Sequence, residues 1–197
     1  MTKRLTSIAL VYLALVAGST SRAQTYSVVY NFGSQMNDPN GHSYSGIIAQ
    51  GRNGNLYSSS TFGGQFGNGA NFMVTAGCVL NTLYSFTNGA DGAGPDGGLT
   101  LGTDGNLYGT ATSYGDQGIA PYGTVFRMTP SGTVDTLYTF ADGSDGAIPF
   151  APPIQGIDGN FYGTTCGGIC EYGPLPTYGS IYKITPSGIF TDRKSVV

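Results

Sequence analysis

The sequence predicts an all-β protein made of repeated four-stranded antiparallel blades, arranged as an incomplete β-propeller. Three observations predict this class. Turn-and-strand motifs recur about every fifty residues, glycine is abundant with 33 residues, and charged residues make up only 10% of the 197-residue chain. Gly-rich turns between aromatic and threonine-rich runs are typical of many short strands. A β-solenoid is the alternative architecture, although its rungs are usually shorter than this period.

The first 23 residues have the three parts of an export signal. Lys3 and Arg4 give a positive start, an apolar run follows at 7–18, and small residues precede a cleavage point after Ala23. The run is shorter than the ~20 residues that span a bilayer, so we expect export instead of anchoring. The mature chain is therefore expected to lack a membrane span and to be secreted or held at the cell surface.

Cleavage leaves an acidic protein. Five basic residues then face eleven acidic ones, a net charge of −6. Nucleic acid is not an expected partner, because binding it requires Lys and Arg to neutralise phosphates, and an anionic membrane surface is disfavoured for the same reason. The expected partner is a surface glycan or another protein.

The repeat is centred on Asp-Gly-Asn-Leu-Tyr at 104–108, with variant copies at 53–57 and 158–162. Asx-Gly supplies the positive φ of a tight turn, and the Leu-Tyr or Phe-Tyr pair suits a strand. A tyrosine that recurs in every unit is expected to pack in the core: Tyr57, Tyr108 and Tyr162. The middle unit predicts four strands, at 98–101, 106–112, 124–129 and 133–140, with a Pro-Ser-Gly turn before the last.

These units predict one domain over residues 24–190. Its expected parts are a lone strand at 26–32, a blade at 40–86, a blade at 94–140, a partial blade at 148–190 and an off-pattern tail at 191–197. Arg193 and Lys194 stand where the repeat has Leu and Tyr, so the third blade is predicted to lack its fourth strand. Propellers have four to eight blades, and we therefore expect the chain to be a truncated piece of a longer protein.

Three linked motifs recur in order along the chain. They are Asp-Gly-Asn-Leu-Tyr-Gly-Thr at 104–110, Gly-Thr-Val-Phe-Arg-Met-Thr-Pro-Ser-Gly at 123–132 and Thr-Leu-Tyr-Thr-Phe at 136–140. Together they resemble the GloVer tandem repeat of exported bacterial proteins, over roughly residues 26–190. The resemblance implies an extracellular or surface repeat protein with propeller-like blades, and it supplies no catalytic residues.

Three cysteines in an exported chain suggest disulfide chemistry. Cys166 and Cys170 lie four residues apart in a glycine-containing loop, and we expect them to form a local disulfide. A metal site is disfavoured because the single histidine, His42, is far away in sequence. Cys78 stands where Gly132 stands in the next unit, and we expect it to be a structural cysteine.

Aspartates in the glycine-rich loops between units raise the question of calcium, which prefers several oxygen ligands close together. The residues concerned are Asp91, Asp96, Asp142 and Asp145. Turn formation by Asp-Gly explains the same residues without a metal. We therefore expect no cofactor, with calcium as the alternative.

Function is expected to depend on loop residues that do not recur. Tyrosines in the long loops are candidates for stacking on sugar rings: Tyr114, Tyr122, Tyr172 and Tyr178. The sequence thus favours a non-catalytic extracellular or cell-surface module for binding or display, with glycans as candidate ligands. The alternative is a propeller-type carbohydrate-active enzyme, a hydrolase or lyase, which would use the single glutamate, Glu171.

Overall fold

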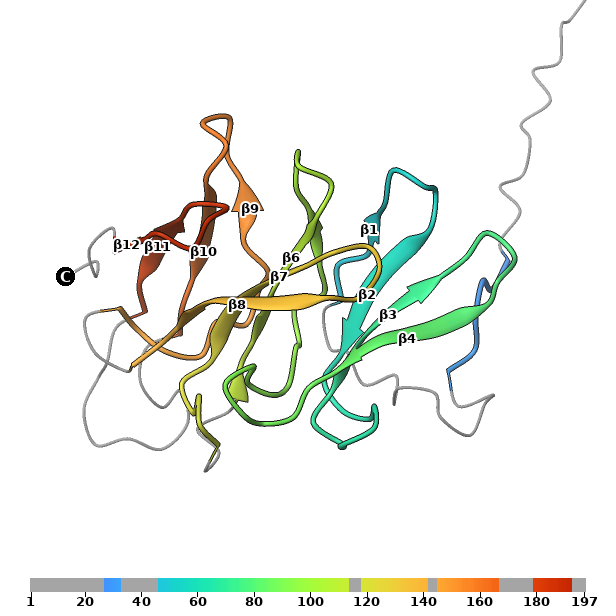
Figure 1. Ribbon diagram of the computed structural model, residues 1–197, viewed down its shortest axis with the longest axis horizontal. Helices are drawn as coiled ribbons and strands as arrows, with labels where there is room; N and C mark the ends of the chain where they lie inside the picture. The colour runs from blue at the N-terminus through green and yellow to red at the C-terminus, as the bar shows by residue number, and fades with distance from the viewer. Residues whose placement is uncertain (1–26, 33–45, 114–117, 142–144, 167–178, 193–197) are drawn as a thin grey trace, which may run out of the picture.

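The computed structural model describes residues 27–32, 46–113, 118–141, 145–166 and 179–192. Twelve strands within these residues form three four-stranded antiparallel sheets (Figure 1). Blade 1 contains β1 (Ala49–Gln50), β2 (Leu56–Ser60), β3 (Ala70–Val74) and β4 (Leu80–Ser85). Blade 2 contains β5 (Thr100–Leu101), β6 (Leu107–Ala111), β7 (Thr124–Met128) and β8 (Val134–Thr139). Blade 3 contains β9 (Ile154–Gln155), β10 (Phe161–Thr164), β11 (Ile181–Ile184) and β12 (Phe190–Asp192).

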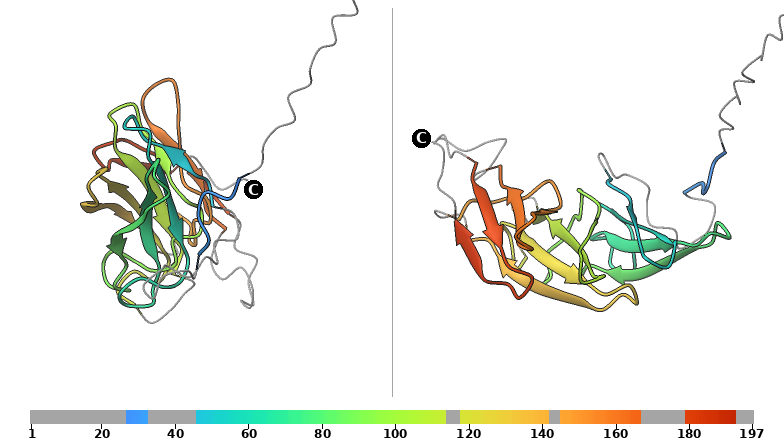
Figure 2. Two further views of the ribbon diagram at one scale, coloured as in Figure 1. Left: turned by 90° about the vertical axis from the view of Figure 1, so that its right-hand side faces the viewer. Right: turned by 90° about the horizontal axis from the view of Figure 1, so that it is seen from above.

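Every blade has the same topology, because its strands pair in chain order. The blades stand side by side in an arc, with the last strands β4, β8 and β12 along the convex side (Figure 2). This arrangement confirms the predicted propeller-like repeat of four-stranded blades. Within the described residues no helix is long and apolar enough to cross a membrane.

The Asx-Gly motif forms the predicted turn between the first two strands of each blade. Gly105 has a φ of +85°, and its equivalents Gly54 and Gly159 have φ values of +81° and +78°. The N–H of Asn106 donates to Oδ1 of Asp104 at 3.1 Å, which fixes the turn from inside. A residue with a Cβ is strained at such φ values, so glycine follows the Asx residue in all three units.

The turn before the last strand also requires a left-handed residue. Gly132 has a φ of +98° and Gly188 a φ of +89°, whereas Cys78 takes this position in blade 1 with a φ of +61°. Each donates its N–H across the turn, and for Cys78 the acceptor is the Thr75 carbonyl at 2.9 Å. Cys78 is exposed, so the expectation of a structural cysteine is wrong.

The third blade does have a fourth strand, which corrects the prediction that it lacks one. β12 pairs with β11 in the register Ile184↔Phe190, Lys183↔Thr191 and Tyr182↔Asp192. The same register, Met128↔Val134, begins the equivalent pair in blade 2. The off-pattern residues start only at Arg193, after the paired segment, so they do not prevent the first three residues from joining the ladder.

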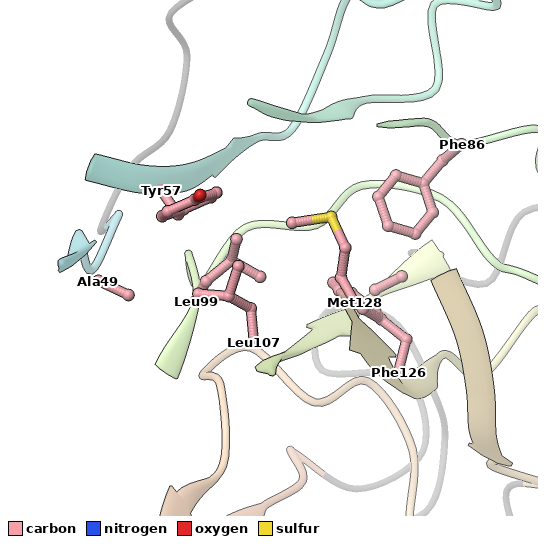
Figure 3. Close-up of a cluster of buried hydrophobic side chains, with 8 residues drawn as sticks. Ala49, Tyr57, Phe86, Leu99, Leu107, Phe126 and Met128 are labelled. Carbon is pink, nitrogen blue, oxygen red and sulfur yellow. The ribbon is translucent and has the colours of Figure 1, made fainter. Parts of the chain in front are cut away.

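The core lies between the blades. One cluster brings Tyr57 of β2 against Leu99, Leu107 and Met128 of blade 2, while Phe86 follows β4 and packs beside them (Figure 3). A second cluster lies between blades 2 and 3: Tyr108, Val125, Phe140, Phe161, Tyr182 and Ile184. The core role is thus confirmed for Tyr57 and Tyr108, whereas Tyr162 on the last blade is only half-buried.

Candidate binding site

A groove lies between residues 27–32, which we call the leading segment, and the first blade. Its volume is about 410 Å³. The leading segment contributes Val28, Val29 and Phe32, and the blade contributes Ile48 and Phe72 among other residues. We call this space the leading groove, and its walls are mainly apolar.

Serines of β2 also line the leading groove, but their hydroxyls are engaged within the protein. Ser58 Oγ donates to the Ile47 carbonyl at 3.1 Å, and Ser59 Oγ donates to the Pro95 carbonyl at 2.7 Å. Because these hydroxyls already have partners, the groove offers mainly apolar contact to an occupant.

The aspartates of the inter-blade loops close their own turns. Asp91 accepts hydrogen bonds from the Thr87 N–H at 2.8 Å, the Gly89 N–H at 3.1 Å and the Tyr84 hydroxyl at 3.0 Å. Burial, the hydrogen bond to Asp91 and the charge of Asp91 raise the pKa of Tyr84 to about 12. Tyr138 donates in the same way to Asp145 at 2.9 Å. Both carboxylates therefore stabilise the inter-blade loops by accepting hydrogen bonds.

The aspartates of the Asx-Gly turns hold a tyrosine of the following strand. Tyr108 donates its hydroxyl to Asp104 at 2.8 Å, and Asn106 Nδ2 donates to the same oxygen at 2.7 Å. Burial acts to raise the pKa of Asp104, but the hydrogen bonds from Asn106 and Tyr108 outweigh it and hold the pKa below its ordinary value. Blade 1 has Asn53 here, whose Nδ2 donates to the Tyr57 hydroxyl at 2.9 Å.

The third copy of this turn carries an ion pair on the side of blade 3 that faces away from blade 2. Lys183 Nζ lies 3.1 Å from Oδ2 of Asp158 and 5.7 Å from the ring centre of Tyr162. Hydrogen bonds from Tyr162, then Asn160, then Lys183 lower the pKa of Asp158. Because the Lys183–Asp158 pair is exposed, salt screens the attraction between its charges, and its contribution to stability is small. We therefore assign it the role of orienting the Tyr162 ring.

Asp96 is a buried carboxylate between two blades. It accepts a hydrogen bond from Thr61, which follows β2, and lies 3.5 Å from Oγ1 of Thr112, which follows β6. Burial raises the pKa of Asp96, against the opposing effect of the two threonine hydroxyls. Asp96 therefore connects blade 1 to blade 2, and its equivalent in the next unit is Phe150.

Two buried polar groups have no hydrogen-bond partner among the described residues. They are the side-chain amide of Asn71 on β3 and the hydroxyl of Tyr182 on β11. Sequence reasoning did not single out either residue. A comparison of the repeats could have found both, because each is polar where the other units have an apolar residue. Asn71 takes the position of Val125 and Ile181, and Tyr182 takes the position of Phe72 and Phe126.

Of the predicted ligand-binding tyrosines, the described residues include only Tyr122. Its side chain is half-buried against the cluster between blades 2 and 3, and its carbonyl accepts the Ile148 N–H at 2.8 Å. The remaining predicted residues lie outside the described part of the chain: Tyr114, Tyr172, Tyr178, Cys170, Glu171, His42 and Asp142. The Cys166–Cys170 disulfide thus stays a prediction.

The aspartates weighed for calcium do not form a ligand cluster within the part of the chain that the structure describes. Within the described residues, no three His, Cys, Asp or Glu side chains lie close enough together to hold a metal ion. Asp91 and Asp145 instead accept hydrogen bonds from their own loops, Asp91 from the Thr87 N–H and Asp145 from the Ala141 N–H at 3.0 Å. The turn-forming explanation accounts for these carboxylates.

The three stacked blades define the class of the protein as an incomplete β-propeller. Virginiamycin B lyase from Staphylococcus aureus is similar in structure, with a TM-score of 0.54 and 21% identity over 84% of this chain and 44% of that one. A streptogramin B lyase structure is similar with a TM-score of 0.51 and 20% identity, over 85% of this chain and 44% of that one. The chain thus spans less than half the length of these propellers.

Sequence comparison gives the family. The chain belongs to the Gloeobacter/Verrucomicrobia repeat family, whose model matches residues 16–195. This match confirms the resemblance inferred from the three linked motifs. No curated protein matches the sequence.

Proposed function

We propose that this protein is an exported, non-catalytic propeller module that binds or displays a partner outside the cell, with glycans as the ligand class. One observation carries the non-catalytic part. The carboxylates that recur between units, such as Asp91 with Asp145 and Asp104 with Asp158, accept hydrogen bonds from their own turns and from a nearby tyrosine. These recurring carboxylates therefore serve to stabilise the turns and strands of the blades.

Binding groups must then come from positions that differ between units. The connections from the second to the third strand lie at the same end of each blade, after Ser60, Ala111 and Thr164. All the candidate tyrosines lie in two of these connections, with Tyr122 the described example. Tyrosine combines an apolar face for a sugar ring with a hydroxyl for hydrogen bonding, which supports glycans as the ligand class.

Glycan-array binding and polysaccharide turnover, measured on the exported protein, test this proposal together. We expect binding without turnover, and we expect Tyr122→Ser to weaken binding at least several-fold. Ile189→Ser is the matched control, because Ile189 is 66% exposed on a different turn. A thermal melt of each variant checks that the fold is kept.

Two results would contradict the proposal. Turnover of a polysaccharide that is abolished by Glu171→Gln would establish the enzyme alternative. Binding to no glycan on the array would remove glycans as the ligand class and leave a protein partner.

Export is tested separately by the N-terminus of the secreted protein. We expect Gln24 as the first residue, since small residues at Ser21 and Ala23 define the cleavage point. Mass spectrometry of the protein recovered outside the host cell measures this directly, and retention of residues 1–23 in the cell membrane would contradict it.

A further inference from the structure

The blades have two ends that differ in chemistry. The Asx-Gly turns lie at one end, which is the upper edge of the molecule in Figure 1. Four connections lie at the other end, which we call the loop end: 61–69, 86–99 and the described parts of 112–123 and 140–153. A further blade would stack beside this row of connections and lengthen it, so access to the loop end does not depend on where the stack stops.

The four connections touch one another in order. The Gly94 N–H donates to the Asn68 carbonyl at 2.9 Å, which joins the second connection to the first. Asn88 of the second connection lies directly against the third. The Ile148 N–H donates to the Tyr122 carbonyl at 2.8 Å, which joins the fourth connection to the third. The loop end is therefore one continuous surface across the blades.

Exposed apolar side chains gather at the loop end. Phe62 and Phe66 of the first connection are 47% and 52% exposed, and Phe150 of the fourth is 43% exposed. The third connection contributes Ile119, which is 77% exposed. Of the phenylalanines that are exposed in the described residues, only the one in the leading segment lies elsewhere. The fold does not require such a ring here, because the counterpart of Phe62 in blade 2 is Ser113.

Uncharged amides accompany these side chains. Gln65 is exposed, and Asn68 and Asn88 are partly exposed. The side-chain amides of these three residues make no hydrogen bond within the part of the chain that the structure describes. The asparagines of the turns at the opposite end are engaged instead, as for Asn53 and Asn106. The loop end therefore offers amide donors and acceptors beside apolar rings.

The described residues of the loop end expose no charged side chain. Asp91 and Asp96 are buried, and Asp145 is partly buried and accepts the hydrogen bonds of its own loop. The lysine and arginine side chains that the structure describes all contact turns at the opposite end: Arg52, Arg127 and Lys183. Charge and exposed rings are thus segregated to opposite ends of the blades.

The remaining parts of the connections follow the same pattern in the sequence. Residues 114–117, 142–144 and 167–178 contain three acidic residues and no lysine or arginine. Proteins bind carboxylate, sulfate and phosphate groups mainly through arginine and lysine, and nearby carboxylates repel such ligands. This composition disfavours an acidic glycan and is compatible with an uncharged one.

On the basis of the proposed function above, we propose that the loop end binds an uncharged glycan. The rings of Phe62 and Phe66 stack on sugar faces, and the amides of Gln65 and Asn68 bind sugar hydroxyls. A sugar ring has apolar C–H groups on its face and hydroxyls around its edge, which matches this combination of rings and amides. Because the exposed groups are spread over connections of successive blades, an extended polysaccharide can contact them in turn.

Matched oligosaccharides test the charge of the ligand. The probes are oligosaccharides of glucose, mannose and galactose, each compared with its uronic acid form, in which a carboxylate replaces the hydroxymethyl group. We expect the exported protein to bind at least one neutral oligosaccharide and to bind its acidic form at least about tenfold more weakly. Titration calorimetry measures both affinities, and the affinity for the neutral oligosaccharide should be the same in low and high salt.

Phe62→Ser and Phe66→Ser test the place of the site. Each substitution should weaken binding of the neutral oligosaccharide about three- to tenfold, because it removes one ring stack. Val79→Ser is the matched control and should bind as the parent protein does, since Val79 is 55% exposed on the turn before β4, at the opposite end of the same blade. All three side chains are exposed, so the variants should keep their fold, which circular dichroism checks.

Three results would contradict the proposal, and they separate it from the proposed function. Equal or tighter binding of an acidic oligosaccharide would overturn the uncharged ligand class while glycan binding itself stands. Unchanged affinity in both phenylalanine variants would overturn the assignment to the loop end, since the glycan would then be bound elsewhere. Binding to no oligosaccharide, neutral or acidic, would remove the proposed function together with this proposal and would leave a protein partner.

Discussion

Replacing Asn71 by valine should stabilise the protein. The side chain is fully buried, and neither its amide nitrogen nor its amide oxygen has a hydrogen-bond partner among the described residues. Leaving a buried polar group unpaired costs about 1–3 kcal/mol. Val125 fills the same position of blade 2 with no exposure, so this backbone accommodates valine without rearrangement. The expected gain is therefore about 1–3 kcal/mol in the free energy of unfolding.

The gain is measurable as a shift of the unfolding transition. For a chain of this size, 1 kcal/mol moves the midpoint temperature by about 2–4 °C, so Asn71→Val should raise it by roughly 2–12 °C. The chain has no tryptophan, so tyrosine fluorescence or near-ultraviolet circular dichroism should follow unfolding. Urea unfolding of the same variant should give a higher midpoint with an unchanged slope, since the surface exposed on unfolding barely changes.

The reverse substitution is the matched control. Val125→Asn places an amide at an equivalent buried position and removes apolar burial, so it should cost about 3 kcal/mol or more. An equal or lower midpoint for Asn71→Val would refute the reasoning, because it would show that the amide is paired in solution, as by an ordered internal water.

Three further substitutions test the equivalence of the units. Tyr182→Phe removes a buried hydroxyl without a described partner and restores the residue found in blades 1 and 2, so it should raise stability by about 1 kcal/mol in urea unfolding. Gly109→Ala should lower stability by about 1–3 kcal/mol, because the new Cβ would lie 2.5 Å from Cζ of Phe126; an unchanged midpoint would show that the ring can move. Asp104→Asn should cost under about 1 kcal/mol at neutral pH, since blade 1 uses Asn53 for the same turn. The pKa of Asp104 is lowered by folding, so its stabilisation is present above its ordinary pKa of 3.8 and is lost as pH falls through the lower folded value. Unfolding midpoints of Asp104→Asn and the parent protein should therefore converge in acid, and a gap that widens there would contradict the assignment.

Local chemistry made much of the fold predictable. The Asx-Gly and Pro-Ser-Gly turns need left-handed glycines wherever they occur, so the strands predicted at 106–112 and 124–129 match β6 and β7 closely. The error at the fourth strand of blade 3 has a physical origin. The prediction weighed the side chains of Arg193 and Lys194, whereas the first three residues of a strand need only backbone pairing and a suitable register, which Phe190 begins.

The candidate site was less predictable, because it depends on contacts between units. Whether Asn71 is buried, or Asp96 lies between Thr61 and Thr112, is decided by how one blade docks on the next. The leading groove likewise exists because Phe32 packs on Phe72, which lies forty residues later in the sequence. Comparison of units at equivalent positions would have pointed to Asn71, since the other units have Val125 and Ile181 there.

In a stacked repeat each unit contacts its neighbours, so positions between blades show what a blade face packs against. Leu99 and Val125 are fully buried in these contacts, whereas their equivalents Ile48 on blade 1 and Ile181 on blade 3 are 62% and 46% exposed. Residues that recur in every unit serve this packing, so ligand recognition must use residues that differ between units.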